Sequence, residues 1–312
     1  MYYKEMFVKE KYLICVDCQG SLSKSGNFLI CQKCGRKYKY SNGILDCIGE
    51  MAEEKIFSQK KWDIFYKNWQ GKGKVDEEYE KSLPIFQKYG VEQILKYYKV
   101  NKKTIYFELG CGTFTIGSLL AKECKLVIGI DFSMPALKIA KKIMDNNGIK
   151  NYLLIRGDIF KIPLKDKTVD LLYGGGVIEH FKDTSGCIRE FARIMKKNGI
   201  ALNAVPFLNI GSLTYRQLWG NIPDFPIIKQ LAEWIHLKLL KGKHMYFGYE
   251  LSFTRLKLKK LHLKYGFKKI KFVRLDCEIM LGFLPVIVRP AARYLAENCS
   301  WFWPMMLVVA KK

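Results

Sequence analysis

The fold class of this chain is indicated by one segment, Thr104-Ile-Tyr-Phe-Glu108-Leu-Gly110-Cys-Gly112-Thr113. Its first half is short and apolar, as in a buried β-strand, and its second half is a glycine-rich turn. Glycines let the backbone approach a ligand closely, and a helix beginning near Ile116 would present N–H groups to it. Strand, glycine-rich turn and helix in this order predict a ligand-binding loop of an α/β sheet.

Further strand-and-loop units follow the first one in order. In doubly wound folds, the acid that ends the second strand meets ribose hydroxyls, and here that acid is Asp131, 23 residues after Glu108. Open α/β sheets bind ligands at the carboxyl ends of their strands, where each unit of this chain carries an acid or glycines. The later units are Lys125 to Asp131, Tyr152 to Ile155 with Gly157-Asp158, and Asp170 to Tyr173 with Gly174-Gly-Gly176.

Residues 100 to 205 resemble the class I S-adenosylmethionine methyltransferases, in the group that includes the ubiquinone-biosynthesis type. The matching motifs are Glu108-Leu-Gly-Cys-Gly112, Ile130-Asp131, Gly157-Asp158-Ile-Phe-Lys-Ile-Pro163, and Asp170-Leu-Leu-Tyr to Val177-Ile-Glu179-His180-Phe. Gly266-Phe267 and Leu307 to Lys312 are similar to the closing strands of that family. The resemblance implies an α/β, Rossmann-like, doubly wound sheet of seven strands and S-adenosylmethionine as the methyl donor.

The resemblance also implies a role for each matching position. Glu108 would bind the methionine amino group, and Asp131 would take both ribose hydroxyls. Asp158 and the backbone of Ile159 would read the adenine amino edge. The remaining cofactor-binding positions are Gly110, Cys111 and Gly112 around the methionine and ribose, Phe132 after Asp131, and Gly174 and Gly175 beside the sulfonium.

Phe114 is a departure from the family pattern, because a third glycine is common at this position. Phenylalanine cannot give the same close approach to a ligand. Either the turn bends differently or the ring packs beside the cofactor. A dinucleotide-binding dehydrogenase is the structural rival of the methyltransferase interpretation, but nothing that resembles its nicotinamide partner residues follows.

Four cysteines form two C-x-x-C pairs near the amino terminus: Cys15 and Cys18, then Cys31 and Cys34, with twelve residues between the pairs. Each pair offers two thiolates from one tight turn, which suits tetrahedral zinc. Four protein ligands leave no open coordination position, so this zinc would be structural. Two disulfides, an iron site of rubredoxin type, or chance are the alternatives.

Residues 11 to 48 resemble the Trm112-like zinc ribbon. The similarity rests on Leu13 to Gly20, Leu29-Ile-Cys31 and Tyr38 to Leu45, with Val16 and Leu45 standing where that family often has proline. The resemblance implies a structural or partner-docking module. We therefore expect a small β-rich zinc ribbon at 1–49, a linker with lead-in helices at 50–100, and a methyltransferase domain at 101–312 with a substrate-lid insertion at 206–250.

Aromatic residues of the lead-in segment share one helical face, because Trp62, Phe65, Tyr66 and Trp69 are three or four positions apart. Core packing is the favoured interpretation, and a lid over a substrate pocket is the alternative. His180 follows the fourth strand and is the candidate catalytic base, with a packing or capping role as the simpler alternative. His244 is a second candidate for the substrate cavity.

The net charge of +24 suits nucleic acid, an anionic membrane or a phosphorylated substrate. Basic residues of 241–274 precede two apolar stretches, Ile279 to Val288 and Trp301 to Trp303, which suit an interfacial surface or, as the favoured interpretation, core strands. No signal peptide is visible and no apolar run approaches the about 18 residues of a spanning helix. We expect a cytoplasmic protein with peripheral contact to an anionic membrane.

Three function classes remain in competition. The first is a methyltransferase for a small-molecule, glycan or lipid-linked acceptor, favoured by the motif set and the apolar carboxyl-terminal region. The second is an RNA methyltransferase that uses the basic surface and the ribbon for docking, although the chain has no N-P-P-Y-type tetrapeptide. The third is a non-catalytic scaffold that keeps the cofactor fold for binding.

Overall fold

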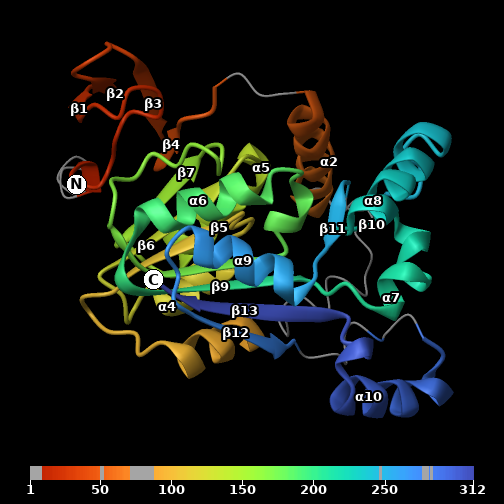
Figure 1. Cartoon of the computed structure of the whole chain (residues 1–312). Helices are drawn as coiled ribbons and strands as arrows, with labels where there is room; N and C mark the ends of the chain where they lie inside the picture. The colour runs from red at the N-terminus through yellow and green to blue at the C-terminus, as the bar shows by residue number, and fades with distance from the viewer. Residues whose placement is uncertain (1–8, 50–52, 71–87, 246–247, 276–280, 282–283) are drawn as a thin grey trace. The chain divides into compact units, whose positions relative to one another are not determined.

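The computed structural model of the chain describes residues 9–49, 53–70, 88–245, 248–275, 281 and 284–312 (Figure 1). The chain divides into two compact units. The first unit contains residues 1–173, 189–200 and 312, and the second contains residues 174–188 and 201–311. Three elements begin in one unit and end in the other: β8 (Val169–Gly175), β9 (Met195–Pro206) and α6 (Thr184–Ile194).

The first unit is built on parallel strands in the order β7-β6-β5-β8. Nearly all residues of β5 to β7 are buried, as expected of parallel strands that are covered on both faces. The register aligns Glu108 with Gly129, so the carboxyl ends of β5 and β6 lie together. The remaining elements here are β5 (Ile105–Leu109), β6 (Leu126–Asp131), β7 (Tyr152–Arg156), α4 (Thr115–Leu120) and α5 (Met134–Asn146).

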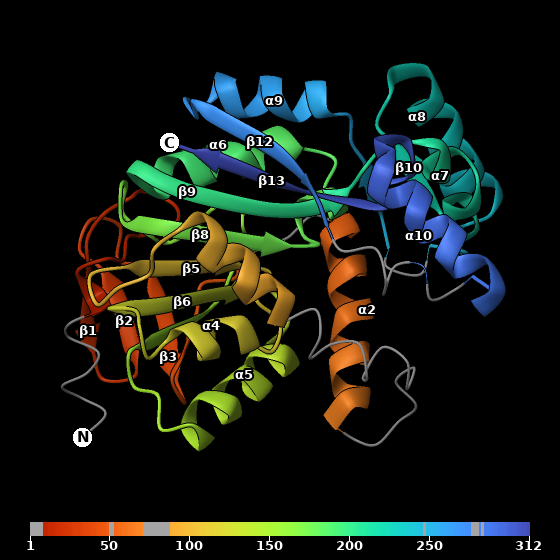
Figure 2. The same cartoon turned by 90° about the horizontal axis from the view of Figure 1, so that it is seen from below.

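The amino-terminal region is an antiparallel meander of four short strands, which confirms the predicted β-rich segment. Its last strand pairs in parallel with β7, with Leu45 opposite Ile155, so the meander continues the same sheet (Figure 2). Asp46 and Arg156 form an ion pair of 3.1 Å across this junction. The strands are β1 (Leu22–Ser25), β2 (Phe28–Cys31), β3 (Lys37–Ser41) and β4 (Ile44–Asp46).

A second contact joins residues 12–14, just before the meander, to the loop after β7. The backbone N–H of Ile14 donates to the carbonyl of Pro163 at 3.1 Å, and the N–H of Lys165 donates to the carbonyl of Tyr12 at 2.8 Å. Together with the β4–β7 pairing, these bonds hold the segment that contains Asp158 on two sides.

Two helices occupy the described part of the lead-in segment: α2 (Glu53–Gln70) and residues 88–97. Trp62, Phe65 and Tyr66 do share one face of α2, with ring centroids 5.1 to 6.0 Å apart. Each of the three is half-buried, and the side chain of Trp69, the fourth aromatic residue of the predicted face, lies outside the described residues. Helix α2 packs beside α5 and stands at the carboxyl ends of the strands of the first unit (Figure 2).

The second unit contains the end of β9 and two antiparallel closing strands, β12 (Lys269–Arg274) and β13 (Met305–Lys311). The helix predicted from Ile227 to Leu240 is present, as an α-helix that continues into a π-helix. With the first unit's strands, the seven strands expected from the sequence are all found. The other elements are α7 (Ile210–Leu213), η2 (Tyr215–Trp219), β10 (Asn221–Pro223), α8 (Pro226–Glu233), η3 (Trp234–Leu239), β11 (Glu250–Ser252) and α9 (Arg255–Lys264).

The favoured interpretation of the two late apolar stretches as core strands is wrong for their described residues. Val286–Val288 form a 3₁₀ turn whose side chains are exposed, and Trp301 lies in another 3₁₀ turn, 64% exposed. Pro285 and Pro304 lie beside these turns, and proline cannot donate the hydrogen bond that a sheet interior requires. The elements here are η5 (Val286–Val288), α10 (Arg289–Asn298) and η6 (Ser300–Phe302).

Within the described residues, no helix is both long enough and apolar enough to cross a membrane.

Candidate functional site

The glycine-rich turn after β5 uses backbone conformations that favour glycine. Gly110 has φ 54° and Gly112 has φ 50°, both left-handed. The N–H of Cys111 between them donates to the carbonyl of Ile130 at 3.0 Å, which fixes the turn against β6. The turn thus leaves its backbone at the carboxyl ends of two adjacent strands, as predicted.

Phe114 takes the backbone conformation that a glycine would take, with φ 54° and ψ 34°, and its side chain is fully buried. Two glycines make room for its ring. A Cβ at Gly117 would lie 2.1 Å from Cε2 of Phe114, and a Cβ at Gly129 would lie 3.0 Å from Cδ2. The turn therefore accommodates Phe114 in a left-handed conformation, and the ring packs between α4 and β6.

Glu108 is buried at the end of β5, with 6% of its surface exposed. Its Oε2 accepts hydrogen bonds from the hydroxyl of Tyr106 at 2.9 Å and from the N–H of Gly117 at 3.0 Å. Burial raises the pKa of this carboxyl to about 8, against the lowering effect of both hydrogen bonds. A cationic group beside Glu108 would favour its ionised form.

Asp131 ends β6 and is also buried. Its Oδ2 accepts from the N–H of Gly112 at 2.9 Å, and its Oδ1 accepts from the N–H of Ser133 at 2.8 Å. Burial raises the pKa of Asp131 to about 6. The carboxylate thus ties the glycine-rich turn to the start of α5, whose N-cap is Ser133.

Asp158 follows β7 and lies next to the same strand end. The N–H of Gly157 donates to the carbonyl of Asp131 at 3.1 Å, and Oδ1 of Asp158 accepts from the N–H of Phe160 at 3.0 Å. Asp158 is half-buried and Ile159 is buried. The first unit therefore brings together the predicted positions Glu108, Gly110, Cys111, Gly112, Asp131, Phe132, Asp158 and Ile159.

Helix α2 supplies three residues to this region that were not among the predicted site positions. Gln59 donates from Nε2 to the carbonyl of Phe132 at 3.3 Å, and Asp63 accepts from the hydroxyl of Ser133 at 2.6 Å. The hydroxyl of Tyr66 lies 2.4 Å from where a Cβ of Gly112 would be. Positions 59, 63 and 66 share a helical face, and that spacing was the signal available in the sequence.

Gly174, Gly175 and His180 belong to the second unit. Gly174 is buried and Gly175 exposed at the end of β8, and η1 (Ile178–His180) follows them. Nδ1 of His180 lies 2.8 Å from the carbonyl oxygen of Tyr249. Because a carbonyl only accepts, Nδ1 carries a proton, which leaves Nε2 as the acceptor nitrogen of the neutral ring. His244, the second candidate, is exposed.

Three buried polar side chains surround this part of the second unit. Oε2 of Glu179, Nε of Arg216 and both amide atoms of Asn203 have no hydrogen-bond partner among the described residues. Burial raises the pKa of Glu179 well above its ordinary value, and Glu250 adds to the rise while Arg216 opposes it. Burial of this carboxyl thus disfavours its charged form.

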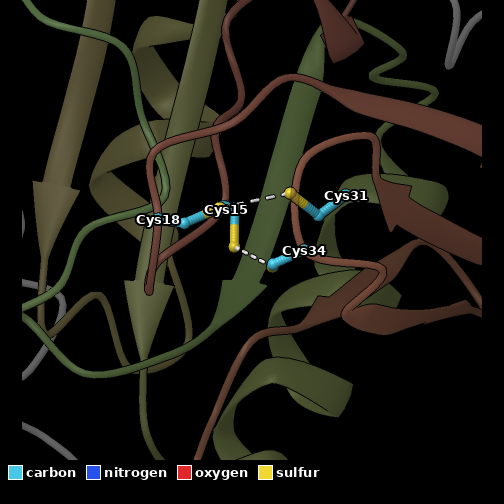
Figure 3. A group of neighbouring side chains, drawn as sticks. All are labelled: Cys15, Cys18, Cys31 and Cys34. Carbon is cyan, nitrogen blue, oxygen red and sulfur yellow. Dashed lines mark hydrogen bonds between the residues drawn. The ribbon is translucent and has the colours of Figure 1, made fainter.

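The four cysteines of the two C-x-x-C pairs converge, with their sulfur atoms all within 4.8 Å of one another (Figure 3). Cys15 and Cys34 have sulfurs 3.7 Å apart, and Cys18 and Cys31 have sulfurs 3.4 Å apart. Zinc–sulfur bonds of about 2.3 Å in a tetrahedron place the sulfurs roughly 3.8 Å apart, so the four thiols fit a tetrahedral metal ion. All four are free cysteines, so the two-disulfide alternative is not what this structure contains.

Tyr38 supports the cysteine cluster from β3. Its hydroxyl lies 3.0 Å from Sγ of Cys15 and accepts from the N–H of Val16 at 3.2 Å. Because the N–H of Val16 occupies the hydroxyl oxygen as acceptor, the hydroxyl hydrogen is available to Sγ of Cys15. Hydrogen bonds of this kind, from a residue that does not itself bind the metal, orient the side chains that do.

Residues 100–210 match a family model described as a methyltransferase domain. A demethylmenaquinone methyltransferase of Lactiplantibacillus plantarum is 31% identical over 137 residues, which is 43% of this chain and 52% of that protein. A malonyl-[acyl-carrier protein] O-methyltransferase of Hamiltonella defensa is 29% identical over 130 residues, covering 41% of this chain and 48% of that protein. This chain thus spans about half the length of these curated relatives.

Solved structures share the fold at low sequence identity. A chain from the complex between the Haloferax volcanii Trm112 methyltransferase activator and a methyltransferase aligns with 80% of this chain and 96% of its own length, at a TM-score of 0.51 and 16% identity. Geranyl diphosphate C-methyltransferase of Streptomyces coelicolor aligns with 71% of this chain and 77% of its own, at a TM-score of 0.50 and 12% identity. These likenesses establish an α/β, Rossmann-like methyltransferase fold.

Proposed function

We propose that this protein is an S-adenosylmethionine-dependent methyltransferase that acts on a small-molecule, glycan or lipid-linked acceptor. The observation that carries the proposal is that Glu108, Asp131 and Asp158 lie at the carboxyl ends of adjacent parallel strands, where Asp131 also bonds to the glycine-rich turn. The match of residues 100–210 to methyltransferase domains supports it. The names of the curated relatives, both small-molecule or carrier-linked methyltransferases, favour that acceptor class.

The residues of the first unit would bind and orient the methyl donor. Glu108 would pair with the amino group of its methionine part, and Asp131 would accept from the ribose hydroxyls. Asp158, with the backbone of Ile159, would receive the adenine amino edge. Gly110, Cys111, Gly112 and Phe132 would line the same site, and Gly174 and Gly175 of the second unit would border the reacting sulfonium.

When bound, S-adenosylmethionine supplies a methyl group on a sulfonium that is already an activated leaving group. The protein's task is therefore alignment of the acceptor and exclusion of water. The acceptor's lone pair forms the new bond to the methyl carbon, the sulfur–carbon bond breaks, and its electron pair stays on sulfur. An alcohol, amine or activated-carbon acceptor must also release one proton.

We propose His180 as the group that accepts this proton at Nε2. The hydrogen bond between Nδ1 and the carbonyl of Tyr249 supports this role because it selects the tautomer in which Nε2 is an acceptor. A packing role for His180 predicts a different result. His180→Gln should lower kcat and remove an acid limb from the pH profile of kcat if His180 is the base, and should leave that profile unchanged if it only packs.

We also propose that Cys15, Cys18, Cys31 and Cys34 hold one structural zinc ion in a Trm112-like ribbon. The proposed organisation is a ribbon at 1–49, lead-in helices at 50–100 and a catalytic domain at 101–312 with a lid at 206–250. The free state of the nine described cysteines supports a reducing, cytoplasmic location.

Labelled methyl transfer from the purified protein to fractionated cell extract tests the function. Label in the metabolite, glycan or lipid fractions is expected. Label in the RNA fraction would favour the RNA methyltransferase for which the net charge of +24 argues. Absence of label in every fraction, with intact donor binding, would favour a non-catalytic scaffold, and Glu108→Gln serves as the matched inactive control.

A further inference from the structure

Exposed apolar side chains are concentrated in one part of the second unit. The described residues contain twenty-four large apolar side chains that are exposed, and eighteen of these lie within residues 210–239 and 286–302. The first unit has four. Monomeric soluble proteins rarely expose large contiguous apolar patches, and those that exist mark interaction sites. We call these side chains of 210–239 and 286–302 the apolar end.

Helix α8 and its continuation η3 present their apolar stripe outward. Ile227, Leu231 and Trp234 follow one another at helical spacing and are 78%, 57% and 55% exposed. On the opposite side, Ala232 and His236 are buried. A surface helix normally buries its apolar stripe, so the exposed stripe of this helix lacks its covering layer within the described chain.

The second part of the apolar end is a tip of consecutive aliphatic side chains. Val286 and Ile287 are 73% and 88% exposed, and Tyr294 and Trp301 follow at 67% and 64%. Tyrosine and tryptophan combine an apolar ring with a polar atom, which suits the boundary between a bilayer and water.

Residues 207–216 connect the two parts of the apolar end. The side-chain amide of Asn209 donates to the carbonyl of Trp303, and Nη2 of Arg216 donates to the carbonyl of Pro304. Helix α7 also contacts η6. In both views, α7 lies between α8 and α10 (Figures 1 and 2). The two parts therefore form one surface within the second unit.

The charges at the end of the outward helix are basic. Lys238, Lys241 and Lys243 are exposed at the end of the outward helix. Among residues 225–245 there is one acid, Glu233, and it accepts a hydrogen bond from the hydroxyl of Tyr249 at 2.6 Å. An apolar helix face bordered by lysines is the arrangement that binds the headgroup region of anionic membranes.

We propose that the apolar end docks this protein on an anionic lipid bilayer, with α8, η3 and the 286–302 tip inserted at headgroup level. The lysines would pair with lipid phosphates. A protein partner or a second copy of the chain would cover apolar area equally well, but neither explains the basic border and the aromatic rings together. Docking requires no methyl donor, so membrane binding can be tested independently of the proposed reaction.

Co-sedimentation with vesicles tests the proposal. Wild-type protein should sediment with vesicles of phosphatidylcholine and phosphatidylglycerol in equal parts, and much less with phosphatidylcholine alone. Combining Ile287→Ser with Trp301→Ser should weaken the partition by about tenfold or more, since two large apolar side chains no longer insert. The matched control is Leu119→Ser, which removes a side chain of similar exposure (56%) from the first unit and should change nothing.

A charge variant separates the lipid from other occupants. Lys241→Glu with Lys243→Glu should reduce sedimentation with the anionic vesicles, whereas Lys125→Glu with Lys142→Glu on the first unit should not. Circular dichroism identifies any variant that fails to fold, and another exposed pair, Ile227→Ser with Leu231→Ser, then replaces it. Wild-type protein that ignores anionic vesicles, or a dimer that the Ile287 and Trp301 changes convert to a monomer, would overturn the proposal.

Discussion

The backbone N–H of Gly112 donates a 2.9 Å hydrogen bond to Oδ2 of Asp131. This bond joins the glycine-rich turn to the acid at the end of the next strand. It also holds the N–H and the carboxylate in the positions where the proposed methyl donor would be bound. Changes at either residue should therefore affect ligand binding before they affect the rest of the fold.

Gly112→Ala should weaken S-adenosylmethionine binding and destabilise the protein. The left-handed φ of 50° costs an alanine roughly 1–3 kcal/mol, and its Cβ would lie 2.4 Å from the hydroxyl oxygen of Tyr66. Adding Tyr66→Ala should recover part of the loss, because it removes the clash but not the backbone strain. Urea unfolding of the single and double variants separates the cost of the clash from the cost of the backbone strain. Strictly additive effects would show that the Tyr66 contact is unimportant.

The affinity for S-adenosylmethionine should rise with pH between about 6 and 8. Burial raises the pKa of Glu108 to about 8, so this carboxyl must lose a proton before it pairs with an ammonium group. One such group changes the dissociation constant by up to about tenfold per pH unit. Calorimetry across this range measures the slope, and Glu108→Gln should flatten it; a flat profile for the wild type would mean that Glu108 does not meet the amino group.

The stability of the ligand-free protein should show the opposite pH dependence. The folded pKa of Glu108 lies above its ordinary value of 4.5, so the folded state binds more protons than the unfolded state between these values. The contribution of Glu108 to the free energy of unfolding is greatest below pH 4.5 and is lost as the pH rises through about 8. Urea midpoints of wild type and Glu108→Gln should converge at low pH and separate at high pH.

Gly117→Ala should be destabilising by about 1–3 kcal/mol, the cost of overpacking a core. The new Cβ would lie 2.1 Å from the ring of Phe114. In a Phe114→Ala background the same change should cost almost nothing, because the ring is gone. A double-mutant cycle by urea unfolding checks this coupling, and equal costs in the two backgrounds would show that the ring does not occupy the space left by Gly117.

Loss of the proposed zinc site should also weaken binding at the cofactor site. Cys15→Ser with Cys31→Ser should release about one zinc ion per chain and loosen β4 and residues 13–14, which flank the segment of Asp158. Affinity for S-adenosylmethionine should fall as a result. Cys299→Ser, outside the cluster, is the control for metal content and affinity; wild-type protein without zinc would remove this part of the account.

The sequence was sufficient to predict a site residue where one segment contains both the strand and the residue at its ligand-facing end. Glu108, Asp131 and Asp158 were singled out because each closes or follows an apolar run, and four of the strands were predicted from the same runs. The expected total of seven strands came from the resemblance to the methyltransferase family. The role of Gln59 and Asp63 was not predicted, and a place for Tyr66 beside the site was only the alternative to core packing. Helix α2 contacts the site through tertiary packing, and spacing alone does not determine which surface a helix face contacts.

Phe114 and the 286–302 tip show two further limits. The position of the Phe114 ring depends on glycines at 117 and 129, which come close only in the folded chain. The apolar run near Val286 has the composition of a core strand, and composition does not say whether a covering layer exists. Flanking prolines were the available signal against a strand.

Calorimetric titration of S-adenosylmethionine into purified wild-type protein and Asp131→Ala measures whether the site binds the methyl donor through Asp131. We expect one site per chain in the wild type and a loss of about 1.5–3 kcal/mol of binding free energy in the variant, as for a lost hydrogen bond to a charged group. Asp145→Ala, an exposed acid on α5, should bind like the wild type. No binding by the wild type, or equal affinity for wild type and Asp131→Ala, would show that the donor is not bound at this site.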